Sequence, residues 1–258
     1  ALKAITRKPS IEKWRGSIFR DDQGRKIIPT YHPAFIIKKY KMRSVVERDF
    51  RRILEQSTFP EVRSPKFNFI LSPNIDQVLH TLSLPIETLS FDIETSGNRV
   101  RCLGLSWSPT DAISIPFITR AHQPHPDAII TFSAPTGSSP SLSYWREEEE
   151  QCILRRLNRV FGNRKIRKIA QNYPFDSTRL LREFGFDIVG LHCDTMLLHH
   201  ALYPELPKAL DFLASIYTEI PYYSDYNPAN DLSTWTYNCY DAVATFQIAQ
   251  KLEAEARL

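Results

Sequence analysis

Residues 90–97 read Ser-Phe-Asp-Ile-Glu-Thr-Ser-Gly, and this stretch decides the fold. Side chains alternate between the two faces of a strand, so Asp92 and Glu94 share one face while Phe91 and Ile93 share the other. Two carboxylates roughly 6–7 Å apart on one sheet face repel each other unless cations lie between them. A solvated edge strand with outward-facing acids is the alternative interpretation. The apolar residues between and before the acids favour an interior strand.

Two further motifs carry an acid beside aromatic residues. Residues 170–176, Ala-Gln-Asn-Tyr-Pro-Phe-Asp, predict a strand end that passes into a helix, with Asp176 in its first turn. Residues 237–241, Tyr-Asn-Cys-Tyr-Asp, lie on the last expected helix, where Tyr237 and Asp241 share one face because they are four positions apart. Taken separately, the helix dipole and ordinary packing explain both motifs.

Taken together, the three motifs indicate a metal-dependent nuclease. Four carboxylates from a strand and two helices can converge on two divalent cations. In phosphodiester hydrolysis one cation activates a water and the other stabilises the leaving 3′ oxygen. Carboxylate oxygens favour Mg²⁺ or Mn²⁺ over zinc. The hydroxyl of Tyr237 could orient the attacking water without acting as a base.

The rest of the pattern predicts an α/β fold with a mixed central sheet. A helix that Ser72 caps follows the first strand, and Ser143 is the expected cap of a later one. Residues 121–143 are rich in Pro and Ser and predict a long loop. The expected strands are 67–71, 89–94, 102–107, 112–117 and 166–170, and the later helices end near 161, 184, 203, 217 and 256.

In their order and content, these motifs resemble the DEDDy 3′–5′ exonucleases, and among them the proofreading domain of family A (polymerase-I-like) DNA polymerases. The resemblance covers the chain from about Lys66 to its end. It implies a ribonuclease-H-like fold, with the mixed sheet flanked by helices. It also implies a 3′–5′ exodeoxyribonuclease that releases nucleoside 5′-monophosphates from DNA ends and works with a polymerase module in cis or in trans.

The resemblance also implies roles for the motif residues. Asp92 would bridge both metals, and Glu94 and Asp241 would bind the water-activating one. Asp176 would hold the other metal, and Tyr237 would align the nucleophile.

Further residues follow from the same resemblance. The backbone of Thr95 would lie against the 3′ terminus, and Asn172 would lie near the substrate. Asp194 would cap the helix that begins there. The family commonly has an apolar wedge after its first motif, whereas residues 97–100 are Gly-Asn-Arg-Val.

The first fifth of the chain is strongly basic. Residues 1–52 hold 15 Lys and Arg against 5 Asp and Glu, a balance of +10, while the remainder has a balance of −6. Residues 24–34 and the following basic helix resemble the C-terminal end of a uracil-DNA glycosylase fold, in which His32 would face the leaving uracil. The water-activating motif and the uracil pocket of that fold are missing. We therefore expect residues 1–60 to be a remnant, joined through a linker at 61–65 to an exonuclease domain at 66–258.

The basic helix supplies candidate DNA contacts. Arg48, Arg51 and Arg52 lie on its polar side and could bind phosphates. A solvated helix face is the alternative.

The composition limits the remaining classes. With 42% hydrophobic and 24% charged residues the chain is globular, and no apolar run approaches the roughly 20 residues of a membrane span. The start at Ala1 without Met suggests a fragment. The four cysteines form no CxxC pair, which predicts buried free thiols rather than a zinc site. The expected compartment is the cytoplasm of a bacterium or a phage-infected cell.

Three alternative functions remain open. A ribonuclease-D-like RNA exonuclease would use the same carboxylates. A DNA-binding module with a dead site and a uracil-excision enzyme are the other two.

Overall fold

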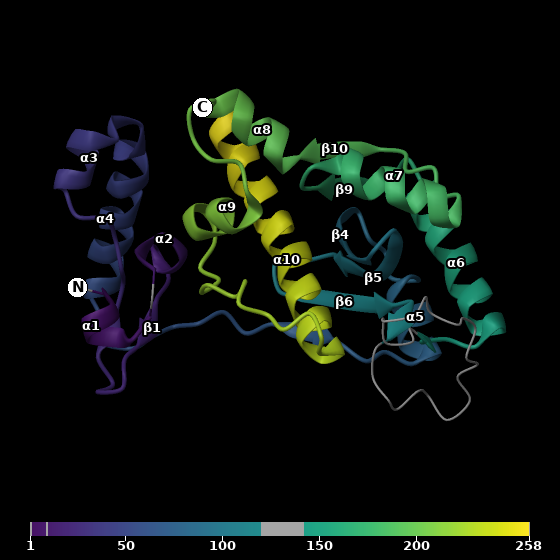
Figure 1. Cartoon of the computed structure of the whole chain (residues 1–258). Coiled ribbons are helices and arrows are strands. Elements are labelled where there is room, and N and C mark those ends of the chain that lie inside the picture. Colours follow the sequence, from purple (N-terminus) through teal and green to yellow (C-terminus); the bar gives the residue numbers. More distant parts are fainter. Residues whose placement is uncertain (1, 9, 120–141, 258) are drawn as a thin grey trace. The chain divides into compact units, whose positions relative to one another are not determined.

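The computed structural model describes residues 2–8, 10–119 and 142–257, and the chain divides into two compact units (Figure 1). The first unit comprises Ala1–Lys66, Met196–Asp225 and Gln250–Leu258, and the second comprises Phe67–Thr195 and Tyr226–Ala249. The break after Lys66 adjoins the expected linker. Residues 1–66, however, form one unit with two later segments that the sequence had assigned to the exonuclease domain.

The second unit contains a six-stranded mixed sheet, which confirms the expected α/β class. Its strands, in spatial order, are β10 (Leu191–Asp194), β9 (Arg167–Ala170), β4 (Thr88–Ser96), β5 (Arg99–Ser106), β6 (Asp111–Pro116) and β3 (Asn68–Ile70). β4 pairs with the parallel strand β9 on one side and the antiparallel strand β5 on the other. It is therefore an interior strand, and the edge-strand alternative is wrong.

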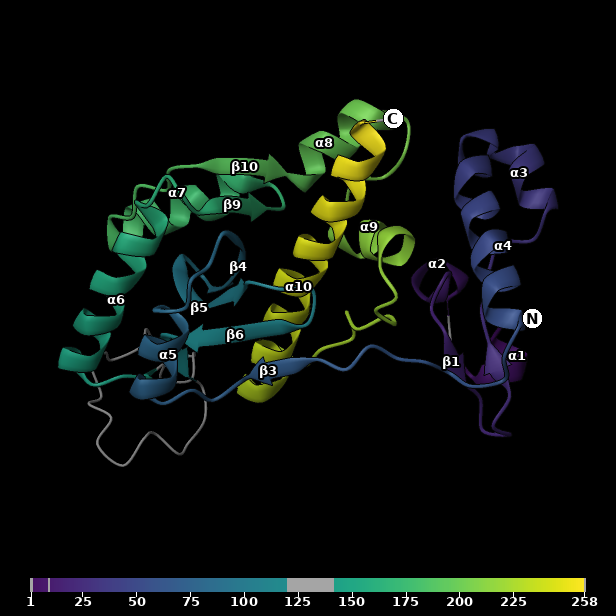
Figure 2. The ribbon, with the colours of Figure 1, turned by 180° about the vertical axis from the view of Figure 1, so that it is seen from behind.

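Helices cover both faces of this sheet. They are α5 (Ile75–Thr81), α6 (Glu147–Phe161), α7 (Tyr173–Phe184) and the part of α10 (Asp231–Ala256) that belongs to this unit. Figures 1 and 2 show α10 along one face and α6 on the other. Phe91 meets Phe161 of α6 edge to face, with ring centroids 5.3 Å apart. On the opposite face the Ser90 hydroxyl donates to the Ala242 carbonyl of α10 at 2.6 Å.

Two expected helix caps are wrong. Asn74, rather than Ser72, caps α5, because its Oδ1 accepts from the Gln77 backbone at 2.9 Å and Gln77 Oε1 accepts from the Asn74 backbone at 3.0 Å. This reciprocal pair satisfies two backbone donors at once. Ser143 belongs to β8 (Leu142–Ser143), which pairs with β7 (Ile118–Thr119), and its hydroxyl donates to the Trp145 carbonyl.

The remainder of the loop expected over 121–143 lies outside the described residues. Among the cysteines, Cys152 is exposed on α6, so the expectation of four buried thiols holds for the other three. No helix in the described part of the chain has the length and hydropathy of a membrane span.

The first unit is mainly helical. Its elements are α1 (Leu2–Thr6), α2 (Ile11–Trp14), β1 (Phe19–Arg20), β2 (Lys26–Ile27), α3 (Ala34–Lys38), the 3₁₀ helix η1 (Tyr40–Met42), α4 (Arg43–Ser57), α9 (Leu210–Tyr217), and parts of α8 (Thr195–Leu202) and α10. Val45 and Val46 on α4 are buried. On the same helix Asp49 forms a buried ion pair with Arg15 at 2.6 Å.

Candidate active site

Asp92 and Glu94 lie on β4 and point to the face that α10 covers. In the β4–β5 pair, Asp92 lies opposite Gly104. Asn238 of α10 donates from its Nδ2 to Asp92 Oδ2 at 2.9 Å and to the Asp92 carbonyl at 3.2 Å. Asn238 therefore orients this carboxylate, a role that the sequence did not suggest.

Gly104 lets α10 come this close. A Cβ at this position would lie 2.7 Å from the Asn238 carbonyl oxygen and 2.8 Å from its Oδ1. The Ser114 hydroxyl donates to Asn238 Oδ1 at 3.0 Å, so both ends of the side-chain amide are bonded. This contact brings Tyr237 and Asp241, the neighbours of Asn238 on α10, to the strand that carries Asp92.

The expected carboxylates come together in space. Asp92, Glu94 and Asp241 each offer an oxygen atom, and these atoms all lie within 4.8 Å of one another. Asp176 is buried in the first turn of α7, and its Oδ1 accepts from the Ile93 backbone N–H at 3.3 Å. Since Ile93 stands between the two acids of β4, Asp176 joins the same cluster.

Burial and mutual repulsion disfavour the charged forms of these acids. Burial raises the pKa of Glu94 to about 7 and that of Asp176 to about 8. The pKa of Asp92 also lies well above its ordinary range, because burial and the charges of Asp241, Asp176 and Glu94 outweigh the Asn238 hydrogen bond. A bound cation would remove this penalty. The donors are all carboxylate oxygens, so they fit Mg²⁺ or Mn²⁺.

Two tyrosines flank the carboxylates. The rings of Tyr226 and Tyr237 stack with centroids 4.1 Å apart and planes at 13°. Burial, followed by the charges of Asp241 and Glu94, raises the pKa of Tyr237, whose hydroxyl is hydrogen-bonded to Asp241. Tyr237 therefore stays a neutral hydroxyl. The Tyr226 hydroxyl is hydrogen-bonded to Glu94.

Arg101 is a buried cation that the sequence reasoning missed. It sits where the β4–β5 register shifts, and it pairs with Asp231 at 2.6 Å and donates to the Pro228 carbonyl at 2.6 Å. Its charge opposes the burial-driven rise in the pKa of Glu94. The available signal was an arginine directly before the largely apolar strand expected at 102–107.

Three other expected residues lie around the start of α7 and the end of β4. Thr95 is near the C-terminal end of β4, and Asn172 precedes α7 in the left-handed conformation, with φ 59° and ψ 51°. The cap of α8 expected at Asp194 stays a prediction, and the structure gives this carboxylate a role at another helix. It accepts from the backbone N–H groups of Asn172 at 3.1 Å and Tyr173 at 2.9 Å, and so caps α7. The reason is that β10 runs parallel to β9, which brings the ends of both strands together.

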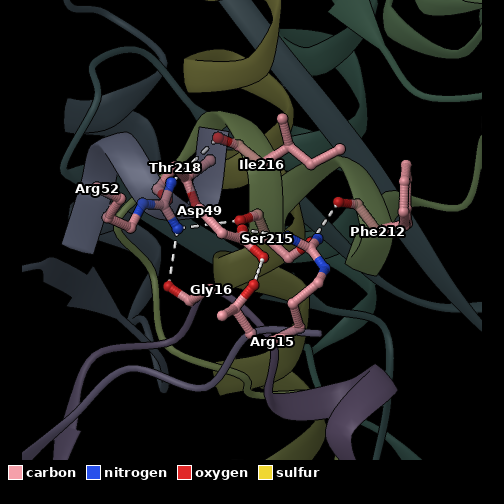
Figure 3. A network of polar contacts seen from close by, with 9 residues as sticks. Arg15, Gly16, Asp49, Arg52, Phe212, Ser215, Ile216 and Thr218 are labelled. Carbon is pink, nitrogen blue, oxygen red and sulfur yellow. Dashed lines mark hydrogen bonds and ion pairs between the residues drawn. The ribbon is translucent and has the colours of Figure 1, made fainter. Parts of the chain in front are cut away.

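The structure corrects the candidate DNA contacts on α4 (Figure 3). Arg52 uses its two terminal nitrogens to donate, at 2.8 to 3.0 Å, to four backbone carbonyls, those of Gly16, Ser215, Ile216 and Thr218. Arg48 pairs with Glu255 at 2.7 Å and donates to the Tyr203 hydroxyl. These two side chains therefore hold the first unit together. Arg51 is exposed, and its contact with DNA stays a prediction.

Comparison with known proteins gives a family match. A family model described as 3′–5′ exonuclease matches residues 78–257, which include all four carboxylates and both tyrosines of the site. No curated protein matches the sequence.

Solved structures give likenesses of fold. The catalytic core of RRP6 from Trypanosoma brucei (mutant C496S) is 14% identical, with a TM-score of 0.51 over 92% of this chain and 60% of that one. The POL domain of Pol1 from M. smegmatis is 16% identical, with a TM-score of 0.49 over 74% of this chain and 28% of that one. Escherichia coli RNase D is 14% identical, with a TM-score of 0.46 over 75% of this chain and 46% of that one. The chain thus spans about 60% or less of these three chains.

Proposed function

Since this chain belongs to the 3′–5′ exonuclease family, we propose that it hydrolyses DNA from the 3′ end, uses two Mg²⁺ or Mn²⁺ ions and releases nucleoside 5′-monophosphates. The observation that carries this proposal is the meeting of Asp92, Glu94, Asp176 and Asp241 beside the Tyr237 hydroxyl.

The side chains divide the work of hydrolysis. Asp92, Glu94, Asp176 and Asp241 would hold the two cations, which supply an activated water and stabilise the leaving 3′ oxygen. The neutral Tyr237 hydroxyl, next to Asp241, would orient the attacking water by a hydrogen bond. Thr95 and Asn172 would contact the 3′-terminal nucleotide.

Residues outside the ligand set would keep this arrangement in place. Asn238 orients Asp92 by its hydrogen bond, and Tyr226 orients Glu94. Asp194 fixes the start of α7, the helix that carries Asp176. Supporting partners of this kind commonly decide how well ligands are aligned.

DNA and a polymerase are the proposed partners, and the cytoplasm is the proposed compartment. The motifs at residues 90–97, 170–176 and 237–241 resemble those of family A proofreading domains, in which excision serves a polymerase joined in cis or acting in trans. The alternatives are a ribonuclease-D-like RNA exonuclease and a DNA-binding module without catalysis.

An end-labelled oligonucleotide digest tests the proposal. Matched single-stranded DNA and RNA are incubated with Mg²⁺, with Mn²⁺ or with chelator. We expect stepwise shortening of DNA from its 3′ end with either metal and none with chelator. If RNA were shortened and DNA were not, the proposed substrate would be RNA rather than DNA. Asp92→Ala should abolish activity, while the exposed Glu87→Gln should not. Equal activity of Asp92→Ala and wild type would overturn the assignment of the site.

Residues 1–60 are proposed to be a glycosylase-like remnant without uracil excision. His32 is exposed, and its Nδ1 accepts from the Ala34 backbone N–H at 3.1 Å, a contact that supports a local structural role at the start of α3. Incubation with uracil-containing DNA should leave no abasic sites. Their formation would show that the segment is an active glycosylase.

A further inference from the structure

A basic pocket of about 470 Å³ lies beside the turn that joins β4 to β5. It is lined by Asn98, Arg99, Arg179, Arg182 and Glu183. Three guanidinium groups face a single carboxylate, so the lining carries a net positive charge. Sequence reasoning assigned none of these residues a role.

The carboxylate of Glu183 is already engaged by the protein. Its Oε2 accepts from the Val100 backbone N–H at 2.6 Å, and its Oε1 pairs with Arg99 Nε at 3.3 Å. Glu183 therefore fixes the start of β5 and positions Arg99. Arg179 and Arg182 remain as the charges that could meet an anion.

The pocket lies close to the carboxylate cluster because both share β4 and α7. Gly97, whose carbonyl accepts from Arg179 at 3.3 Å, is three residues beyond Glu94. At the rise of a strand this separation is roughly 10 Å. Along α7, Arg179 and Arg182 follow Asp176 at intervals of three residues, so successive side chains stay near one side of the helix. Neighbouring nucleotides of one strand can span such a distance.

An aromatic face adjoins the same arginines. Phe175 is 45% exposed, and the Arg179 guanidinium lies 5.1 Å from the centroid of its ring. Exposed aromatic rings beside arginines are the usual platform for unpaired bases, while the arginines contact the backbone.

We propose that Arg179 and Arg182, in the pocket beside the Arg99–Glu183 pair, bind a backbone phosphate of the substrate strand, with Phe175 supporting an adjacent unpaired base. This inference rests on the proposed exonuclease function. It adds a second point of attachment that holds the strand while its 3′ end reaches Asp92 and Glu94. Guanidinium groups suit this ligand because their planar donors match phosphate oxygens.

Charge reversal at Arg182 tests the proposal. Arg182 is exposed, so Arg182→Glu should fold, and Arg159→Glu on the exposed side of α6 is the matched control. Binding of a labelled single-stranded oligonucleotide is measured with chelator present, so that cleavage cannot occur. We expect Arg182→Glu to bind about tenfold or more weakly, since charged hydrogen bonds are the strong ones, and Arg159→Glu to bind as the wild type does.

Salt dependence and a small substrate complete the test. Loss of one phosphate contact should lower the slope of log affinity against log salt by about 0.7. Hydrolysis of a chromogenic ester of a single nucleotide, measured for the wild type and Arg159→Glu, reports the proposed exonuclease chemistry separately from strand binding. If the two variants had equal oligonucleotide affinities and equal salt slopes, the proposal that this pocket binds a phosphate would be overturned. If the wild type hydrolysed no substrate, the exonuclease proposal would be overturned. The binding measurement would still show whether the pocket binds the oligonucleotide.

Discussion

Glu94→Gln should stabilise the metal-free protein while it removes most of the activity. The substitution keeps the size of the side chain and an oxygen that can accept from the Tyr226 hydroxyl, but it removes one negative charge from the cluster. In the wild type this charge is unfavourable, because burial raises the pKa of Glu94 from 4.5 to about 7. The protein therefore carries a stability penalty at its active site whenever no cation is bound.

The sign and size of the effect follow from proton linkage. As the pH rises through 4.5, the unfolded chain releases this proton first, whereas the folded protein keeps it until about pH 7. The folded wild type binds more protons over this window, so its stability falls as the pH rises. With about 1.4 kcal/mol for each pKa unit, the penalty above the window is about 3 kcal/mol. Gln does not titrate, so the variant should not have this stability penalty.

Chemical denaturation with chelator present checks this reasoning. Near pH 4 the two proteins should have similar free energies of unfolding, and at about pH 8 the variant should be more stable by up to about 3 kcal/mol. Adding Mg²⁺ should stabilise the wild type more than the variant, since only binding to the folded state raises stability. Glu87→Gln removes an exposed charge and should change little. A variant no more stable than the wild type at high pH would refute the account of the buried charge.

Three further changes test other parts of the structure. Tyr237→Phe should slow hydrolysis roughly 10²-fold while Mn²⁺ affinity, measured by calorimetry, stays near that of the wild type; a large loss of affinity would show that the hydroxyl helps to bind metal. Gly104→Ala should destabilise the protein by about 1–3 kcal/mol and reduce activity, because the new Cβ would meet the Asn238 carbonyl at 2.7 Å; normal urea unfolding would contradict this packing. Arg52→Ala should destabilise by about 3 kcal/mol or more, since four carbonyls lose their donor, whereas Arg51→Ala should stay within about 0.5 kcal/mol.

Local sequence signals predicted the parts of the site that lie within one element. The alternation of Phe91, Asp92, Ile93 and Glu94 placed the two acids on one face, because the period of a strand is two. The helical spacing of Tyr237 and Asp241 likewise placed them together. Signals of this kind depend only on the chain near each residue, so they survive whatever the rest of the fold does.

Contacts between distant elements were not predictable in the same way. Asp194 precedes its own helix and was expected to cap it, but nothing local in the sequence indicated that it caps α7, which it does because β10 and β9 run side by side. Arg52 looked like a solvent-facing cation on a basic helix, but carbonyls near residue 216 take its donors. In both cases the partners that the structure shows are distant in sequence and are brought close by folding.

The sequence alone therefore determined which residues are proposed to carry the chemistry, since the acids and the tyrosine occur at strand and helix spacings and in this order along the chain. Only the tertiary structure decided how they are supported: Asn238 reaching Asp92 across Gly104, Tyr226 bonded to Glu94, and Arg101 buried nearby. The physical reason is that the periodicity of a strand or helix orients a side chain, whereas hydrogen bonds and close packing require two surfaces whose meeting the local pattern does not encode.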